Sequence, residues 1–175
     1  MRKKILFKAP VLTRSGYGEQ SRYALRALRT REDLFDIYIQ PLQWGATSWS
    51  SDLDEEREWI DYTIEKTIGY IQQGGQFDVS FQVTIPNEWE RIAPINIGYT
   101  AGIETNRVAH EWLIKANEII DNIITISSHS KNVYKNTHYE VTNPQNPEEK
   151  HHLSLQKPIE FINYPTKKFD NLAEL

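Results

Sequence analysis

The chain has 175 residues, a formal net charge of −4 and no cysteine; 39% of its residues are hydrophobic and 25% are charged. This length and composition are typical of one globular domain and exclude a disordered chain. The lack of cysteine excludes disulfides and thiolate metal sites, and the negative net charge argues against nucleic acid as a partner.

No stretch approaches the roughly 18 apolar residues of a membrane span, and residues 1–12 lack the apolar run of a signal peptide. We therefore expect a cytoplasmic protein. Peripheral contact with the inner membrane face stays open, because basic residues crowd the start of the chain, although a solvated helix face is the more common reason for such crowding. These residues are Arg2, Lys3, Lys4, Lys8, Arg14, Arg22, Arg26, Arg29 and Arg31.

The first predicted unit is a short buried strand over residues 4–9, a glycine-bearing loop over 13–18 and an amphipathic helix. Such a strand, loop and helix begin a doubly wound sheet, and the N–H groups at the helix start can hold a phosphate. The loop matches neither G-x-G-x-x-G nor a P-loop, so a plain tight turn is an equally good interpretation.

The second unit is a strand over residues 35–39, an aromatic loop over 42–51 and a helix over 52–73. Trp44 and Trp49 in the loop could stack on a sugar ring, but we favour packing. The helix opens with acidic residues and is ended by two glycines. Its expected buried stripe is Trp59, Ile60, Thr63, Ile64, Ile68 and Ile71.

The central segment, residues 85–105, follows a third strand over 77–83 and contains a fourth over 95–99. Small residues come next, and then Glu104 and Thr105, where we expect a helix over 106–117 to begin. A carboxylate and two hydroxyls beyond a strand's carboxyl end lie where open α/β sheets bind ligands. The simpler alternative is that Thr105 caps the helix and Glu104 faces solvent. The residues expected to point inward from the helix are Val108, Ala109, Trp112, Leu113 and Ala116.

The remaining pattern predicts a strand within residues 119–126, a short serine-capped helix beginning at 127–131, and a last strand over 158–163. Residues 136–157 have the weakest pattern and read as a turn-rich loop, and His151 and His152 are a weak metal signal. We predict an α/β fold of the Rossmann-like type, with a mainly parallel sheet and helices on both faces. One domain would cover residues 4–163, and residues 164–175 would be a linker or tail.

Four pieces of the chain, in this order, resemble motifs of one enzyme family. They are Ser15-Gly16-Tyr17-Gly18-Glu19-Gln20-Ser21-Arg22, Ile97-Gly98-Tyr99-Thr100-Ala101-Gly102-Ile103-Glu104-Thr105, Asp121-Asn122-Ile123-Ile124-Thr125-Ile126-Ser127-Ser128-His129-Ser130-Lys131, and Pro158-Ile159-Glu160-Phe161-Ile162. Together they look like the N-terminal domain of a GT-B-fold glycosyltransferase of the retaining family 4, or group 1, type. The resemblance spans about residues 4–170.

The resemblance implies that this domain holds an acceptor and closes over the diphosphate of a nucleotide-sugar. A C-terminal domain, supplied in cis or in trans, would bind that donor and carry a Glu-x7-Glu motif. Glu140 and Glu148 have this spacing, but the prolines between them forbid the helix that the motif needs. The family's hinge sequence is replaced by Ile162-Asn163-Tyr164-Pro165, and the histidine that many relatives place after the central strand is absent.

The resemblance assigns Gly16, Tyr17 and Gly18 to the donor diphosphate and makes Glu104 the candidate catalytic carboxylate. The donor would be a nucleotide-sugar, the acceptor a glycan, lipid or small molecule, and no metal is expected. The acceptor cleft would be lined by Tyr99, Thr100, Thr105, Ser127, Ser130 and Lys131. Two other hypotheses stay open. One is a non-catalytic Rossmann-like module that binds an acceptor or a partner protein, and the other is a self-contained nucleotide-using α/β enzyme.

Overall fold

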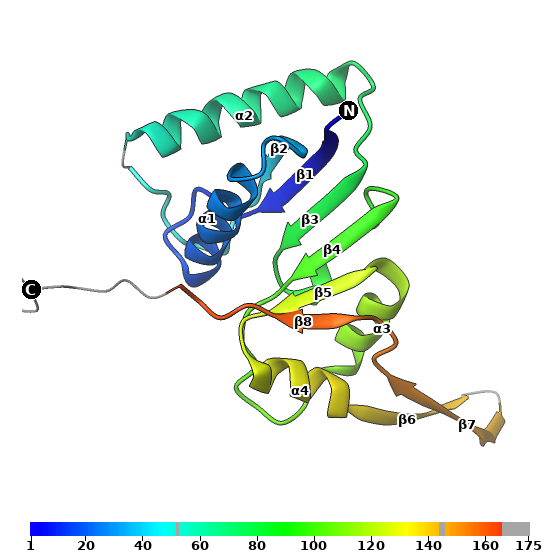
Figure 1. The fold of residues 1–175 in the computed structure, drawn as a ribbon. Coiled ribbons are helices and arrows are strands. Elements are labelled where there is room, and N and C mark those ends of the chain that lie inside the picture. The colour runs from blue at the N-terminus through cyan, green and yellow to red at the C-terminus, as the bar shows by residue number, and fades with distance from the viewer. Residues whose placement is uncertain (52, 144–145, 166–175) are drawn as a thin grey trace, which may run out of the picture.

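A six-stranded parallel sheet organises the chain (Figure 1), and the computed structural model describes residues 1–51, 53–143 and 146–165. The spatial order is β2-β1-β3-β4-β5-β8, and every neighbouring pair is parallel. The predicted α/β class is therefore confirmed. The strands are β1 (Lys3–Ala9), β2 (Phe35–Pro41), β3 (Val79–Val83), β4 (Ile95–Tyr99), β5 (Asn122–Thr125) and β8 (Ile159–Phe161).

The strand order fixes where the direction of winding reverses. The chain steps from β1 to β2 on one side and then crosses to β3 on the other side of β1. This is the flavodoxin-like order of doubly wound folds, extended by one strand, β8, beside β5. The switch point consequently lies between β1 and β3.

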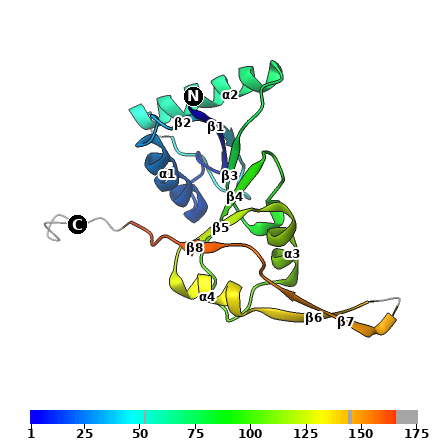
Figure 2. The same cartoon turned by 45° about the vertical axis from the view of Figure 1, so that its right-hand side comes forward.

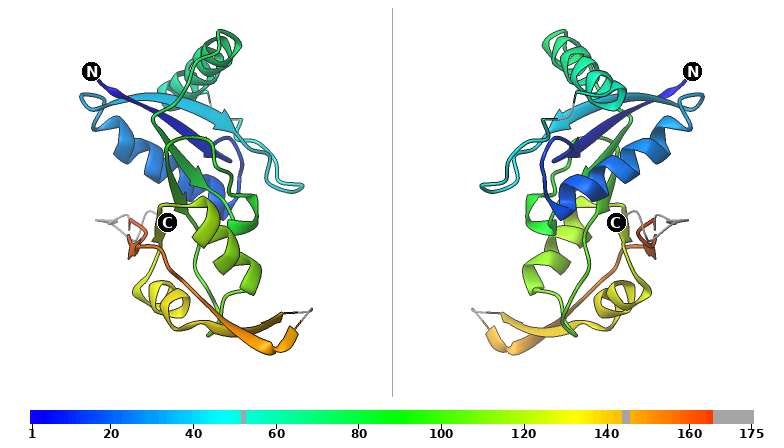
Figure 3. Two further views of the ribbon diagram at one scale, coloured as in Figure 1. Left: turned by 90° about the vertical axis from the view of Figure 1, so that its right-hand side faces the viewer. Right: turned by 90° about the vertical axis from the view of Figure 1, so that its left-hand side faces the viewer.

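Helices α1 (Gly16–Arg29) and α3 (His110–Ile119) cover opposite faces of the sheet (Figure 3). Alternate residues of a strand point to opposite faces, so each face has its own core. In β5, Ile124 packs with the core beneath α1, whereas the adjacent Ile123 packs with the core beneath α3. Helix α4 (Ser128–Asn136) packs against β5 and β8.

Helix α2 (Glu55–Gln72) runs beside the edge strand β2. The Ile39 N–H donates to Thr67 Oγ1 at 2.8 Å, and Lys66 Nζ donates to the Ile37 carbonyl at 2.8 Å. The helix thus satisfies backbone groups that an open sheet edge would expose. Because α2 packs beside an edge, its buried stripe is narrower than predicted, and Ile68 and Ile71 are 52% and 49% exposed.

The segment between β3 and β4 covers the sheet face without an α-helix, using only the 3₁₀ helix η1 (Pro86–Glu88). Trp89 is fully buried and lies over Gly98, where an added Cβ would come within 2.5 Å of the indole ring. Asn96 Oδ1 accepts from the N–H groups of Ile92 and Ala93 at 3.0 and 3.1 Å. Packing and hydrogen bonds together hold this segment on the sheet.

Two sequence predictions are wrong in this half of the molecule. Helix α3 begins at His110 rather than at residue 106, and Thr105 does not cap it, because its hydroxyl donates to the Arg107 carbonyl within the preceding turn. The segment predicted as a loop forms a hairpin of β6 (His138–Asn143) and β7 (Asn146–Ser154), which extends from the body (Figure 2). Its pattern was weak because, among its residues whose burial the structure describes, Tyr139 and Leu153 at its base are those that pack against a core.

Residues 164 and 165 are described, and the rest of the predicted tail, residues 166–175, lies outside the described residues. The Tyr164 hydroxyl donates to Gln20 Oε1 at 2.9 Å, which fastens the chain after β8 to α1. None of the helices in the described part of the chain has the length and apolarity that crossing a bilayer requires.

Candidate functional site

The candidate site lies at the edge of the sheet where the parallel strands end. The β1–α1 loop, the ends of β3 and β4, and the turn from β5 into α4 all follow carboxyl ends of strands, so they meet at one edge. Open α/β sheets bind ligands at this edge, outside the switch point. Here that position is beside the start of α1, between β1 and β3.

Tyr17 connects the start of α1 to the end of β4. Its hydroxyl lies 3.0 Å from Thr100 Oγ1 and accepts from the Ala101 N–H at 3.1 Å. Its ring lies 4.3 Å from that of Trp44, centroid to centroid. Burial raises the pKa of Tyr17, and the nearby charge of Glu88 adds to the rise. Tyr17 is therefore a neutral hydrogen-bonding joint between two loops, and Trp44 packs on it.

The two glycines of the loop have different roles. Ser15 Oγ caps α1 by accepting from the Gly18 N–H at 2.9 Å, and an added Cβ at Gly18 would lie 2.1 Å from the Thr13 carbonyl oxygen. Gly18 thus allows the start of α1 to pack closely against Thr13. A Cβ at Gly16 would meet no atom within 4 Å. Within the described residues, no hydrogen bond uses the N–H of Gly16 or Tyr17, so the helix start can offer these two donors to an anion.

A second joint ties the central segment to α4. Ser127 Oγ accepts from the Ser130 N–H at 3.0 Å, and Ser130 Oγ accepts from the Ile103 N–H at 3.0 Å. Ser130 and Thr100 are each only 1% exposed. The buried Ser130 and Thr100 hydroxyls therefore fix the loops in place rather than line an open cleft.

The other expected site residues differ in their exposure and in their contacts. Glu104 and Thr105 are exposed, and within the described residues no hydrogen bond or ion pair involves the Glu104 carboxylate. Lys131 pairs with Glu160 of β8 at 2.6 Å. Tyr99 instead lines an apolar cavity of about 470 Å³ between α1 and the sheet, and burial raises its pKa to about 12.

Glu88 is a further candidate site residue, which sequence reasoning missed. It follows β3 at the switch point, and Thr84 Oγ1 donates to its carboxylate at 2.6 Å. Its charge acts on Tyr17. The sequence signal was a carboxylate shortly after a strand, the same signal that pointed to Glu104. Only the strand order distinguishes the two positions.

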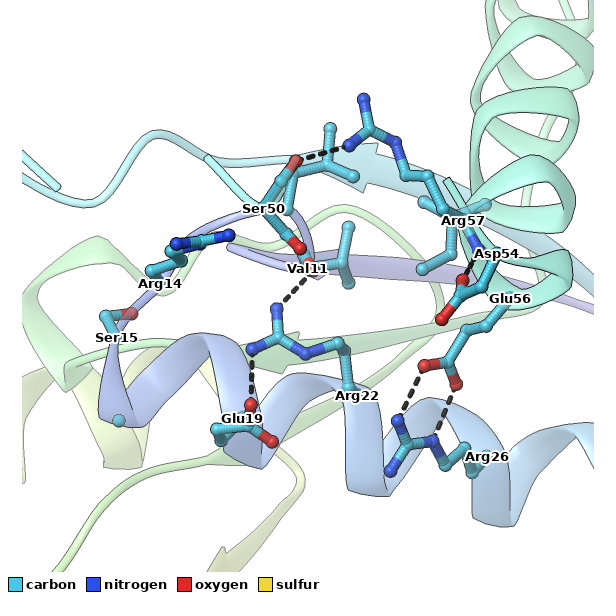
Figure 4. A pocket seen from close by; sticks show the side chains of 13 residues that line it. Val11, Arg14, Ser15, Glu19, Arg22, Arg26, Ser50, Asp54, Glu56 and Arg57 are labelled. Atoms are coloured by element: carbon cyan, nitrogen blue, oxygen red, sulfur yellow. Dashed lines mark hydrogen bonds and ion pairs between the residues drawn. The ribbon is translucent and has the colours of Figure 1, made fainter. Parts of the chain in front are cut away.

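A cavity of about 550 Å³ opens beside the same helix start, between α1 and the beginning of α2 (Figure 4). Charged side chains of both signs form its rim. Arg22 donates to the Val11 and Thr13 carbonyls and to Glu19, at 2.8, 3.0 and 2.8 Å. Arg26 binds Glu56 through two hydrogen bonds of 2.6 Å each, which join the two helices. Residues of the first sequence motif line this cavity, namely Ser15, Gly16, Glu19 and Arg22, whereas the residues that α2 adds to it were not predicted.

Across residues 1–51, 53–143 and 146–165, no three or more His, Asp or Glu side chains are grouped so that they could hold a metal ion. Comparison with known proteins yields no match, either to a family model, to a curated protein or to a solved structure. The functional argument consequently rests on the motifs of the sequence and on the geometry of this edge.

Proposed function

We propose that this chain is the N-terminal, acceptor-side lobe of a GT-B glycosyltransferase. With a donor-binding lobe in cis or in trans, it would move a sugar from a nucleotide-sugar to an acceptor hydroxyl. The observation that carries the proposal is the Tyr17 joint, because it holds the start of α1 against the end of β4 at the ligand-binding edge of a parallel sheet. The order of the motifs along the chain is the second support.

The chemistry follows from what each group can do. The departing nucleoside diphosphate gains negative charge, and the Gly16 and Tyr17 N–H groups at the positive end of the α1 dipole would stabilise it. Glu88 is better placed than Glu104 to meet an acceptor hydroxyl, since it lies at the switch point beside Tyr17. Tyr99, Ser127 and Ser130 would support the site through packing and loop position.

The experiment combines this chain with a donor-binding lobe, by fusion or co-expression, and measures release of nucleoside diphosphate from UDP-glucose, UDP-N-acetylglucosamine and GDP-mannose. Gly16→Val would place a side chain over the free N–H groups, and we expect it to lower release by about 100-fold or more, the range found for a lost oxyanion donor. Gly69→Val, at another open helical glycine, is the matched control. Unchanged release in the Gly16 variant would refute the role of the loop.

A non-catalytic binding module is the second candidate. The exposed position of Glu104 favours this candidate, because within the described residues no hydrogen bond or ion pair orients this expected catalytic carboxylate. This candidate predicts saturable binding of a glycan or protein with no diphosphate release from any of the three donors, even when the donor-binding lobe is present.

A further inference from the structure

Helix α2 lies at the outer margin of the fold, beside the edge strand β2 (Figure 1). Its inward side contains Ile60, Thr63 and Thr67, and each of these residues is 2% exposed. The adjacent side of the helix is also apolar, but Ile68 and Ile71 on it are 52% and 49% exposed within the described part of the chain. The apolar stripe of α2 is therefore wider than the surface that the sheet covers.

The exposed side of α2 forms one wall of a groove of about 480 Å³. Ile64 and Ile68 line this wall, and the Arg57–Asp61 ion pair lies beside them. Trp49, from the loop after β2, also lines the groove and is 53% exposed. Contiguous exposed apolar side chains with a charged rim mark surfaces that contact other proteins.

The residues along this side of α2 have the spacing of a coiled-coil seam. Asp61, Ile64, Ile68 and Ile71 follow one another at intervals of three, four and three residues. Such spacing keeps the side chains in line along the helix, so that they can pack between the side chains of a facing helix. The surface therefore suits a second helix with the same pattern, and α2 of another copy of this chain has that pattern.

The charges along the seam select the orientation of such a pair. A parallel pair would place Asp61 against its counterpart in the second copy, and like charges in this position disfavour association. An antiparallel pair centred on Ile68 would instead pack Ile64 against Ile71. It would also place Asp61 beside residues 69–75 of the facing chain, which carry no charge.

The flanks of the antiparallel pair are complementary as well. Beside the seam, Glu65 of one helix would lie next to Gln72 of the other, whose amide N–H groups can donate to the carboxylate. The dipoles of the two helices would run in opposite directions, so that unlike ends are neighbours. Both features favour two identical copies related by a two-fold axis.

We propose that this chain forms a two-fold dimer through antiparallel packing of α2 on α2. Ile68 lies at the centre of the contact, Ile64 and Ile71 lie on either side of it, and Trp49 lies at the rim. The dimer buries the part of the apolar stripe that a single copy leaves exposed. This inference is independent of the proposed function, because it uses none of the residues of the Tyr17 joint.

Analytical ultracentrifugation of the whole chain from about 1 to about 300 μM tests the proposal, since contacts through one helix are among the small, weak interfaces. We expect a reversible dimer. Ile68→Glu would place two carboxylates at the two-fold axis and should raise the dissociation constant by about 100-fold or more. Ile114→Glu is the matched control, because Ile114 is a 38% exposed isoleucine of another helix, α3. It should leave the dissociation constant unchanged.

Disulfide cross-linking tests the orientation, because the native chain contains no cysteine. In the antiparallel dimer, Ile68→Cys would bring two thiols together at the two-fold axis, within the range in which a disulfide forms, whereas Asp61→Cys would keep them apart. A parallel pair would cross-link both variants. Ile114→Cys measures cross-linking by random collision.

Four results would overturn the proposal: a monomer at every concentration, native-like dissociation of Ile68→Glu, an equal effect of Ile114→Glu, or cross-linking of Asp61→Cys as efficient as that of Ile68→Cys. Circular dichroism of each variant shows whether the fold is kept. A dimer that Ile68→Glu weakens and Ile114→Glu does not, with efficient cross-linking confined to Ile68→Cys, would support it.

Discussion

The hydroxyl of Tyr17 lies 3.0 Å from Thr100 Oγ1, although the two residues are 83 positions apart in the chain. The same hydroxyl accepts from the Ala101 N–H. One side chain at the start of α1 therefore fixes the backbone that follows β4. The arrangement of the candidate site depends on this joint.

Tyr17→Phe should lower the free energy of unfolding by about 1–3 kcal/mol, because the buried Thr100 hydroxyl and the Ala101 N–H lose their partner. Urea unfolding of Tyr17→Phe, Thr100→Val and the double variant would measure this loss and the coupling between the two residues. Tyr62→Phe is the control, since Tyr62 is 67% exposed. Additive losses would show that the two hydroxyls do not act as a pair.

Gly98→Ala should destabilise the fold by about 1–3 kcal/mol, because the new methyl group would overlap the buried ring of Trp89. Gly69→Ala has open space around it and should raise stability by about 0.5–1 kcal/mol through helix propensity. Thermal unfolding gives both values, and near-UV circular dichroism reports on the Trp89 environment. Equal stability of the two variants would contradict the close packing of Trp89 on Gly98.

Gly18→Ala and Gly16→Ala should differ sharply, despite their shared motif. The Gly18 substitution forces a methyl group against the Thr13 carbonyl and should cost about 1–3 kcal/mol, whereas the Gly16 substitution meets open space and should cost little. Denaturant midpoints of the two variants make the comparison. If Gly16 were the more sensitive position, the division between a packing glycine and an open glycine would be wrong.

Alkaline pH should unfold the protein partly through Tyr99. Burial raises the pKa of this tyrosine from its ordinary value of 10.0 to about 12, so its neutral form is favoured in the folded state. The stability that this preference contributes is fully present below pH 10 and is lost as the pH rises through about 12. Between pH 9 and 12 the free energy of unfolding should fall less steeply for Tyr99→Phe than for the native chain. Tyr62→Phe should follow the native chain. Equal slopes for Tyr99→Phe and the native chain would contradict this assignment.

The sequence by itself determined the elements whose signals are local. Short apolar segments marked the strands from β1 to β5, acidic residues and glycines marked the ends of α2, and Ser127 marked the start of α4. These signals come from burial and capping among near neighbours, which a short window of sequence contains. The α/β class followed from their alternation.

Only the tertiary structure decided what those elements bring together. It placed α2 beside the edge of β2, put Glu88 rather than Glu104 at the switch point, and opened a charged cavity between α1 and α2. It also showed that the segment of weak pattern, residues 138–154, is a hairpin whose two strands pair with each other. The physical reason is that strand order and long-range pairs, such as Tyr17 and Thr100, arise from contacts between segments that are distant in the chain. Periodicity along the chain indicates only which side of each element is buried.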